Sequence, residues 1–299
     1  MVLLITGANG QLGSELNNIL QRGASELGAL PAAYEGCEVL AVDVDELDIT
    51  SPGAVDSFFS RHKPDLVFNC AAMTNVDGCE SDEERAYRVN ALGPMNLAVA
   101  SRKHGSRLLH VSTDYVFDGL GTRPYVETDE PAPNTAYGRT KLAGEKAVLD
   151  SCGGSCICRT AWLYGYVGNN FVKTMLRLAR ENGRLKVVGD QVGNPTSAVD
   201  LAYQLALLGA SRESGIFHCT CGGDPVSWHA FAERIVQRAG LAVPVESCTS
   251  GEFPRPAKRP AYSALENRHL EETIGNSMRD WKEALDSFLE QYLEQEKNV

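Results

Sequence analysis

The sequence predicts an α/β fold, in which a doubly wound parallel sheet carries helices on both faces and is followed by a smaller lobe. Short apolar runs of strand length alternate with helical stretches over roughly the first 160 residues. Because each return to the sheet then passes through a helix, the strands are expected to run parallel and to be covered on both sides. A chain of 299 residues is long enough to bury a core of this size.

The first part of the chain contains five predicted strands, each a short run of mostly apolar residues. They cover residues 2–6, 38–42, 65–69, 107–112 and 155–160. Between them, helices are predicted over residues 11–22, 53–62 and 82–104 and from Tyr137 onward.

The remaining part has a looser rhythm and many Gly and Pro residues. Helices are predicted near 170–181, from Asp200, from Trp228 and near 279–296, and strands at 185–188 and 215–219. We therefore expect a first domain over residues 1–160 and a smaller C-terminal α/β lobe over residues 161–299. This lobe should close over a cleft and be interleaved with the first domain.

Composition argues against several kinds of partner. The formal net charge of −11 disfavours binding to nucleic acid or to a membrane surface. The sequence contains no run of about 18 apolar residues, so no transmembrane helix is predicted. The opening residues, MVLLITGANG, lack a basic flank, so they are expected to form a buried strand rather than a signal peptide.

The nine cysteines are an odd number without the spacing of a disulfide framework, which predicts a reducing, cytoplasmic location. Two pairs, Cys156 with Cys158 and Cys219 with Cys221, place thiols on the same side of a strand, as a metal site would require. The CxxC spacing typical of zinc sites is missing, so buried cysteines are the favoured interpretation.

A glycine-rich loop follows the first predicted strand and opens the first helix. Gly7, Gly10 and Gly13 have the GxxGxxG spacing, with Gln11 and Leu12 between the last two. The first glycine permits a tight turn, the second lets backbone approach a pyrophosphate, and the third lets the helix pack closely on the strand. The helix N-terminus then faces the anion. This context predicts a dinucleotide-binding site and therefore a Rossmann-type sheet.

Acidic residues follow the second predicted strand. Asp43 ends that strand, where a carboxylate accepts hydrogen bonds from the adenosine ribose and repels a 2′-phosphate. Asp43 therefore favours NADH over NADPH without forbidding NADPH. Asp48 has two interpretations, contact with the adenine amino group or a cap for the helix that follows.

Tyr137 and Lys141 lie four residues apart, so they share one face of a helix. Such a pair usually belongs to a solvated face. However, a GxxGxxG loop followed much later by YxxxK resembles the extended short-chain dehydrogenase/reductase superfamily. The segments NCAA at 69–72 and STD at 112–114, each at the end of a predicted strand, fit the same pattern.

The resemblance implies that hydride transfer to a carbonyl carbon forms an alkoxide, to which Tyr137 gives a proton. Lys141 would favour the ionised phenol and hold the nicotinamide ribose, and Thr113 would hydrogen-bond the carbonyl oxygen. The residues implied to contact the cofactor besides the glycine loop, Asp43, Asp48, Tyr137 and Lys141 are Ile49, Ala71, Ala72 and Thr74.

Tyr115 stands where nucleotide-sugar dehydratases of this superfamily have Glu. The resemblance therefore implies that the residues for carbonyl reduction are present, whereas the carboxylate used for elimination of water is missing. The blocks STDYVFDG and YGRTKLAGE resemble the dTDP-4-dehydrorhamnose reductase family, with similarity from Val2 to about Arg259. This implies NAD(P)H-dependent reduction of the C4 carbonyl of dTDP-4-dehydro-6-deoxy-L-mannose to dTDP-L-rhamnose. The alternatives are another nucleotide-sugar epimerase or reductase, or a non-catalytic regulatory subunit of the same fold.

Carried over by position, the resemblance places Thr74 and Val76 beside cofactor and sugar. It implies that Asp114, Tyr115 and Trp162 contact the deoxyhexose or its thymidine diphosphate, although Trp162 also suits the core.

The stretch FPRPAKRPAY concentrates three cations in a Pro-rich loop. We expect Arg259, helped by Arg255 or Lys258, to neutralise the substrate diphosphate. The alternative is an ordinary basic surface loop.

Some relatives are dimers bridged by magnesium through glutamates. Glu15 matches one ligand, but Val199 stands where a second carboxylate is expected, and Asp200 comes one place late. We therefore predict no metal in the site, regard magnesium as doubtful, and expect a monomer or a weak homodimer.

Overall fold

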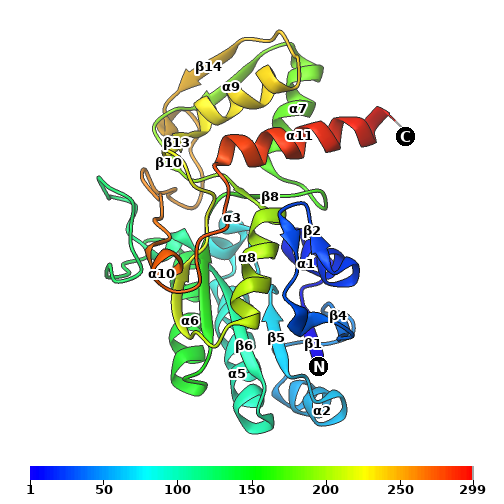
Figure 1. Ribbon diagram of the computed structural model, residues 1–299. Coiled ribbons are helices and arrows are strands. Elements are labelled where there is room, and N and C mark those ends of the chain that lie inside the picture. The colour runs from blue at the N-terminus through cyan, green and yellow to red at the C-terminus, as the bar shows by residue number, and fades with distance from the viewer. Residues whose placement is uncertain (298–299) are drawn as a thin grey trace.

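The computed structural model describes residues 1–297 and contains a central sheet of six parallel strands (Figure 1). The last two residues of the expected second lobe, 298 and 299, lie outside the described residues. The strand order is β12-β7-β6-β5-β1-β4, and every pairing within it is parallel. The strands are β1 (Val2–Thr6), β4 (Glu38–Val42), β5 (Leu66–Asn69), β6 (Arg107–Thr113), β7 (Cys156–Thr160) and β12 (Gly215–His218). The predicted parallel sheet is therefore confirmed.

Helices cover both faces of the sheet, and strand residues alternate between two apolar cores. Leu3 and Ile5 pack with α1 (Gln11–Arg22) and α8 (Ala198–Ala210), whereas Leu4 faces the opposite core. The helices over that second face are α2 (Pro52–His62), α5 (Gly93–His104) and α6 (Ala136–Ser151). The doubly wound arrangement brings the carboxyl ends of β1, β5, β6 and β7 to one edge.

The second half of the chain returns to the sheet before completing a separate layer above it. Strand β12 joins the sheet beside β7, and α8 packs on α1. The upper layer in Figure 1 contains α7 (Phe171–Asn182), α9 (Trp228–Arg238) and α11 (Trp281–Lys297). Its two main strands, β9 (Leu185–Val188) and β14 (Val245–Cys248), pair in parallel with each other.

The helix predicted over 82–104 is interrupted. It consists of α4 (Glu83–Tyr87), a π-helical turn over Arg88–Leu92, and α5. Pro94 lies near the start of α5 and has no N–H to donate to the carbonyl of Asn90, so the α-helical ladder cannot continue there. Gly144 of α6 approaches this carbonyl closely, because an added Cβ would lie 2.1 Å from the Asn90 oxygen.

Among residues 1–297, no helix combines the length and apolar character that crossing a bilayer demands. All nine cysteines are free thiols, and those of Cys156, Cys158, Cys219 and Cys221 are buried. Their favoured interpretation as buried cysteines is confirmed.

Candidate active site

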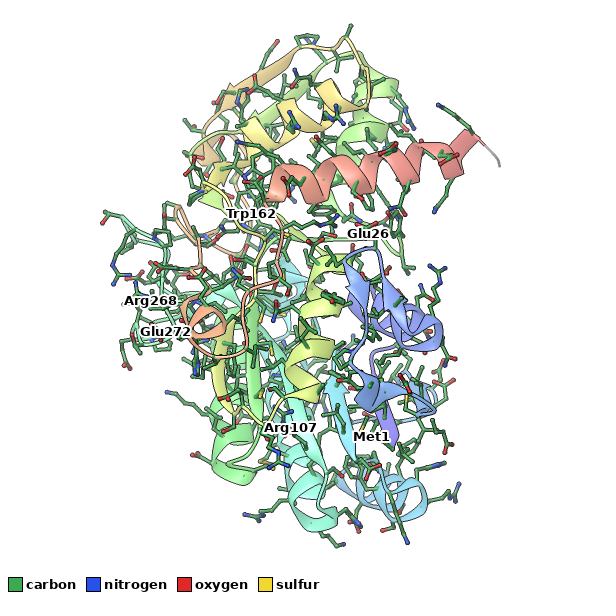
Figure 2. The ribbon with its side chains drawn as sticks, in the orientation of Figure 1. Met1, Glu26, Arg107, Trp162, Arg268 and Glu272 are labelled. Carbon is green, nitrogen blue, oxygen red and sulfur yellow. The ribbon has the colours of Figure 1, made fainter. Side chains whose placement is uncertain are left out.

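A cavity of about 780 Å³ opens at the carboxyl edge of the sheet. Its lower wall comes from the ends of β1, β5, β6 and β7, and Trp162 and Trp228 contribute from the second half of the chain. Figure 2 shows Trp162 where the upper layer meets the sheet. Of the predicted site residues, all except the cations of the Pro-rich loop (Arg255, Lys258 and Arg259) line this cavity: Gly7, Gly10, Gln11, Leu12, Gly13, Asp43, Asp48, Ile49, Ala71, Ala72, Thr74, Val76, Thr113, Asp114, Tyr115, Tyr137, Lys141 and Trp162.

The glycine loop has the geometry that an anion site requires. Gly7 has a φ of +68°, and a Cβ there would lie 2.7 Å from Ala71 backbone atoms, so this turn admits only glycine. A Cβ on Gly13 would lie 2.3 Å from the Gly7 oxygen. Gly10 is the N-cap of α1 and no side chain caps this helix, which has no acidic residue in its first turn. The first amides of α1 are therefore available to a pyrophosphate.

Asp43 is tied to the glycine loop. Its carboxylate accepts hydrogen bonds from the Asn9 amide at 3.0 Å and from the Val44 amide at 2.8 Å, while its remaining lone pairs face the cavity rim. Asp48 accepts hydrogen bonds from the amide and hydroxyl of Thr50, and the cap of α2 is Ser51. The interpretation of Asp48 as that helix's cap is therefore wrong, because Ser51 lies directly before the first turn and takes the role.

Tyr137 and Thr113 meet at the centre of the cavity wall. Tyr137 is at the start of α6, whose N-cap is Thr135, and Gly138 lets the helix pack against the Tyr115 carbonyl. Burial is the largest effect on the pKa of Tyr137 and raises it, against the lowering effect of the Thr113 hydroxyl. That Lys141 favours the ionised phenol stays a prediction, and in the described chain burial favours the protonated phenol. A protonated phenol is the state that a proton donor needs.

Lys141 lies one turn along α6 from Tyr137 and is almost fully buried. Its Nζ donates to the carbonyl of Val111 at 2.7 Å and lies 3.3 Å from Nε2 of His110. Burial lowers the pKa of Lys141 to about 8, against the raising effect of Glu145 and Cys70. The lysine therefore carries a positive charge that no carboxylate contacts directly within the described residues.

Asp114 and Tyr115 follow Thr113 at the end of β6. The Thr113 hydroxyl donates to Asp114 Oδ1 at 2.9 Å, whereas Asp114 Oδ2 is buried and, although the Ser263 hydroxyl is close enough to lower the pKa of Asp114, makes no hydrogen bond of good geometry among the described residues. Burial raises the pKa of Asp114 to about 6. The Tyr115 ring meets the Tyr137 ring edge-on, with 5.4 Å between centroids. An unpartnered buried oxygen beside the cavity is suited to accept a ligand hydroxyl.

Trp162 is both strained and stacked. Its φ of +46° is a conformation that non-glycine residues rarely adopt, and it costs about 1–3 kcal/mol. Trp228 stacks on the indole with 3.4 Å between ring centroids and 5° between planes. Gly193 leaves room for the ring, since a Cβ there would lie 2.7 Å from it. The ring packs on Trp228 and also lines the cavity, and contact of Trp162 with the substrate stays a prediction.

Sequence analysis missed several lining residues, among them Arg85, Val89, Gly168 and Trp228. Arg85 and Val89 lie four residues apart on the interrupted helix, so their spacing was a usable signal. Nothing in the sequence near Trp228 indicates that α9 begins at the cavity.

Arg259 lies behind the cavity wall. It pairs with Asp77 at 2.9 Å, and Arg255 approaches the same carboxylate at 3.9 Å. Arg259 also lies beside the Tyr115 hydroxyl, where its charge opposes the rise in the pKa of that phenol, which burial brings to about 12. Its Nη1 is buried and has no partner in the described part of the chain. The cation predicted to meet a diphosphate is thus held by Asp77 and is in contact with the site through Tyr115.

Of the two carboxylates considered for magnesium, Asp200 has another partner. Asp200 is fully buried and accepts two hydrogen bonds from the Arg279 side chain, at 2.8 and 2.6 Å, and one from its backbone amide at 3.2 Å. Burial raises the pKa of Glu15. Residues 1–297 contain no group of three or more His, Cys, Asp or Glu side chains arranged to hold a metal ion.

A dinucleotide loop, an acid after the second strand and a Tyr–Lys pair beside a Thr hydroxyl, all in one cavity, define an oxidoreductase of the short-chain dehydrogenase/reductase superfamily. A sequence model described as RmlD substrate binding domain matches residues 1–294. The chain belongs to this family, that of the dTDP-4-dehydrorhamnose reductases.

The relatives match over nearly their full length. The chain is 45% identical over 290 residues to a dTDP-4-dehydrorhamnose reductase of Mycobacterium tuberculosis, covering 95% of this chain and 90% of the relative. A solved dTDP-4-dehydrorhamnose reductase of Clostridium acetobutylicum is 48% identical with a TM-score of 0.92, covering 98% of this chain and 100% of that one. Another, from Bacillus anthracis in complex with NADP, is 38% identical with a TM-score of 0.90, covering 97% and 99%.

Proposed function

We propose that this protein reduces the C4 carbonyl of dTDP-4-dehydro-6-deoxy-L-mannose to give dTDP-L-rhamnose, the last step of dTDP-rhamnose synthesis, with NAD(P)H as cofactor. The observation that carries the proposal is the meeting of the Tyr137 phenol and the Thr113 hydroxyl in the wall of the cavity that also contains the glycine loop. Two hydroxyls at one point suit a carbonyl oxygen that becomes an alcohol.

The residues present fit a nicotinamide dinucleotide. The uncapped first turn of α1 with Gly10 and Gly13 would hold its pyrophosphate, and Asp43 its adenosine ribose. When bound, this cofactor supplies the hydride. Lys141 would donate hydrogen bonds to the nicotinamide ribose from its place one turn below Tyr137.

The chain's own task is to bind the ketone and move one proton. Thr113 would turn its hydroxyl hydrogen from Asp114 to the carbonyl oxygen, and Tyr137 would donate its phenolic proton to the same oxygen. The positive charge of Lys141 favours the phenolate left behind. Tyr115, in place of a glutamate, provides no carboxylate for removal of water.

The second half of the chain, residues 161–299, is proposed to supply one wall of the nucleotide-sugar pocket. The stacked Trp162 and Trp228 would form an apolar wall, and Asp114 Oδ2 would accept a sugar hydroxyl. Thr74, Val76 and Tyr115 would complete this pocket.

The finer preferences rest on single features. Asp43 supports a preference for NADH, whereas the Bacillus anthracis relative was solved with NADP. Free thiols at all nine cysteines support a cytoplasmic location.

The test is an assay of the purified protein with dTDP-4-dehydro-6-deoxy-L-mannose and, in separate reactions, NADH and NADPH. One reduced cofactor should be oxidised per sugar, and the product should be dTDP-L-rhamnose. Isomerisation of the sugar without net cofactor oxidation would contradict the proposal and indicate an epimerase. A protein that binds reduced cofactor but converts no sugar would indicate another substrate or a regulatory subunit.

A further inference from the structure

A chain of buried polar side chains lies behind Lys141, from the ends of β1 and β5 to the middle of β6. Thr6 Oγ1 donates to Asn69 Oδ1 at 2.8 Å, and Asn69 Nδ2 lies 2.9 Å from Nδ1 of His110. The other ring nitrogen of His110 lies 3.3 Å from the Nζ of Lys141. Thr6, Asn69, His110 and Lys141 are each at most 1% exposed. The proposed reaction assigns no role to Asn69 or His110.

One backbone amide determines the direction of these hydrogen bonds. The amide of Ala71 donates to Asn69 Oδ1 at 3.1 Å, and a backbone N–H can only donate. The Asn69 oxygen therefore faces Ala71 and Thr6, and its NH₂ group faces His110. Consequently Nδ1 of His110 accepts a hydrogen bond and carries no proton.

A neutral imidazole has a single N–H, which must then be on Nε2. The ring is neutral because burial lowers the pKa of His110 well below its usual value, with a further lowering effect from Lys141. The Nε2–H group points at Lys141, whose Nζ already donates to Val111. A protonated lysine faces this N–H with a hydrogen of its own, whereas a neutral amine accepts from it with its lone pair.

We propose that Asn69 and His110 are positioning residues, which present an N–H group to Lys141 and thereby weaken its hold on its third proton. The role of Lys141 in the reaction rests on the proposed function, but the hydrogen-bond arrangement does not. His110 acts on catalysis only through Lys141, since it does not line the cavity.

Other groups facing Lys141 do not supply this effect. Glu145, one turn further along α6, attracts the lysine proton, but its charge is shared with Arg159, which it contacts at 2.7 Å. Cys70 at the end of β5 is a neutral thiol, because burial raises its pKa to about 12. Tyr137 is a neutral phenol, because burial raises its pKa as well. His110 is thus the polar group facing Lys141 that disfavours its charged form, alongside burial.

Nitrogen NMR of the wild-type protein tests the arrangement without any substitution. With labelled histidine, the His110 ring should show a protonated Nε2 and an unprotonated Nδ1 from neutral pH to pH 9, and its signals are assigned by their loss in His110→Gln. A protonated Nδ1 or a titrating ring would overturn the proposal.

Carbon NMR of labelled lysine side chains tests the consequence. Lys141 should titrate near pH 8 in the wild type, with the signal assigned by its loss in Lys141→Met. Asn69→Asp places a carboxylate oxygen against Nδ1, which moves the ring proton there and leaves Nε2 as an acceptor. The Lys141 midpoint should then rise by at least about one pH unit, a tenfold change in proton affinity.

Thr6→Val is the matched control, because it removes a hydrogen bond to Asn69 while the Ala71 amide still orients the side chain. It should leave the Lys141 midpoint within about 0.3 units of the wild type. An unchanged midpoint in Asn69→Asp, or an equal rise in both variants, would overturn the proposal. No sugar enters these measurements, so failure of the proposed reaction would leave their outcome unaffected.

Discussion

Two buried cations, Lys141 and Arg159, pack against the same helix but have opposite surroundings. The Arg159 guanidinium donates three hydrogen bonds to Glu145, at 2.7 to 3.2 Å, and its centre lies 5.1 Å from the Phe117 ring. Lys141 lies one turn nearer the cavity, and among residues 1–297 the polar contacts of its Nζ are a carbonyl and a neutral imidazole. Both side chains are almost completely shielded from solvent.

The difference distinguishes a charge that serves the structure, that of Arg159, from one that is available to a ligand or a reaction, that of Lys141. A buried ion pair satisfies its own charges and holds α6 to β7. A buried cation without a carboxylate destabilises the native state, and it is expected where a ligand or a reaction uses the charge. Tyr137, Lys141 and Glu145 follow one another at four-residue intervals. The unpaired cation and the carboxylate of the ion pair therefore lie on a single face of α6.

The largest change in stability is expected for the buried ion pair between Glu145 and Arg159. Glu145→Gln leaves Arg159 buried without its partner, so the free energy of unfolding should fall by about 3–5 kcal/mol. Urea unfolding measures this change, and the double variant Glu145→Gln/Arg159→Met should recover most of the loss. A loss below about 1 kcal/mol would show that the pair is not the structural element described.

Lys141→Met should change the free energy of unfolding in the opposite direction and stabilise the protein. Since burial holds the pKa of Lys141 near 8 in the native state and the usual value is about 10.4, the charged form is disfavoured by folding. Unfolding free energy at pH 7 should rise by about 2–3 kcal/mol in the variant. This gain should shrink as the pH rises from 8 to above 10, because the wild-type lysine loses its charge in both states.

Lys146→Met is the control for that experiment. Lys146 is exposed on the same helix, so its replacement should change the unfolding free energy by no more than about 0.5 kcal/mol. Destabilisation of Lys141→Met at pH 7 would contradict the comparison between the two cations.

Asp114 is an anionic counterpart of Lys141, and Asp114→Asn should stabilise the protein by about 2 kcal/mol at pH 7. Burial raises the pKa of Asp114 to about 6 from a usual value near 3.9. The native state then binds the extra proton, so the wild type loses stability as pH rises from about 4 to 6. The gain should vanish at pH 4. Asp118→Asn provides a control of opposite sign, because the Tyr125 hydroxyl lowers the pKa of Asp118.

The smallest effect is expected for Arg259, which lies between the two extremes, being paired with Asp77 yet partly exposed. Arg259→Gln should raise the KM for the nucleotide sugar about fivefold, or about 1 kcal/mol, without changing the Kd for NADH. Lys186→Gln is the control, because Lys186 forms an ion pair with Glu252 at the surface and does not line the cavity. Equal losses for sugar and cofactor would exclude a role of Arg259 in binding the diphosphate.

Local patterns explain why most of the sheet and cavity floor were predictable. The apolar runs, the GxxGxxG loop and the Tyr137–Lys141 spacing are short-range features, and the predicted strands at 2–6 and 38–42 match the observed bounds. The π-helical turn was not predictable, because it depends both on Pro94 and on the close approach of Gly144 to the Asn90 carbonyl. These residues belong to segments that are distant in the sequence. Neither the Trp162–Trp228 stack nor the Asp77–Arg259 pair has a sequence signature, because each joins residues more than 60 positions apart.

Tyr137→Phe removes the hydroxyl that is proposed to donate the proton in the reduction. Oxidation of reduced cofactor by dTDP-4-dehydro-6-deoxy-L-mannose should be measured for wild type and variant, after fluorescence has shown that both bind the cofactor equally well. We expect kcat to fall by about 10²–10⁴-fold in Tyr137→Phe while cofactor affinity is retained. A variant that keeps kcat within about tenfold of the wild type would contradict it, because another group would then supply the proton.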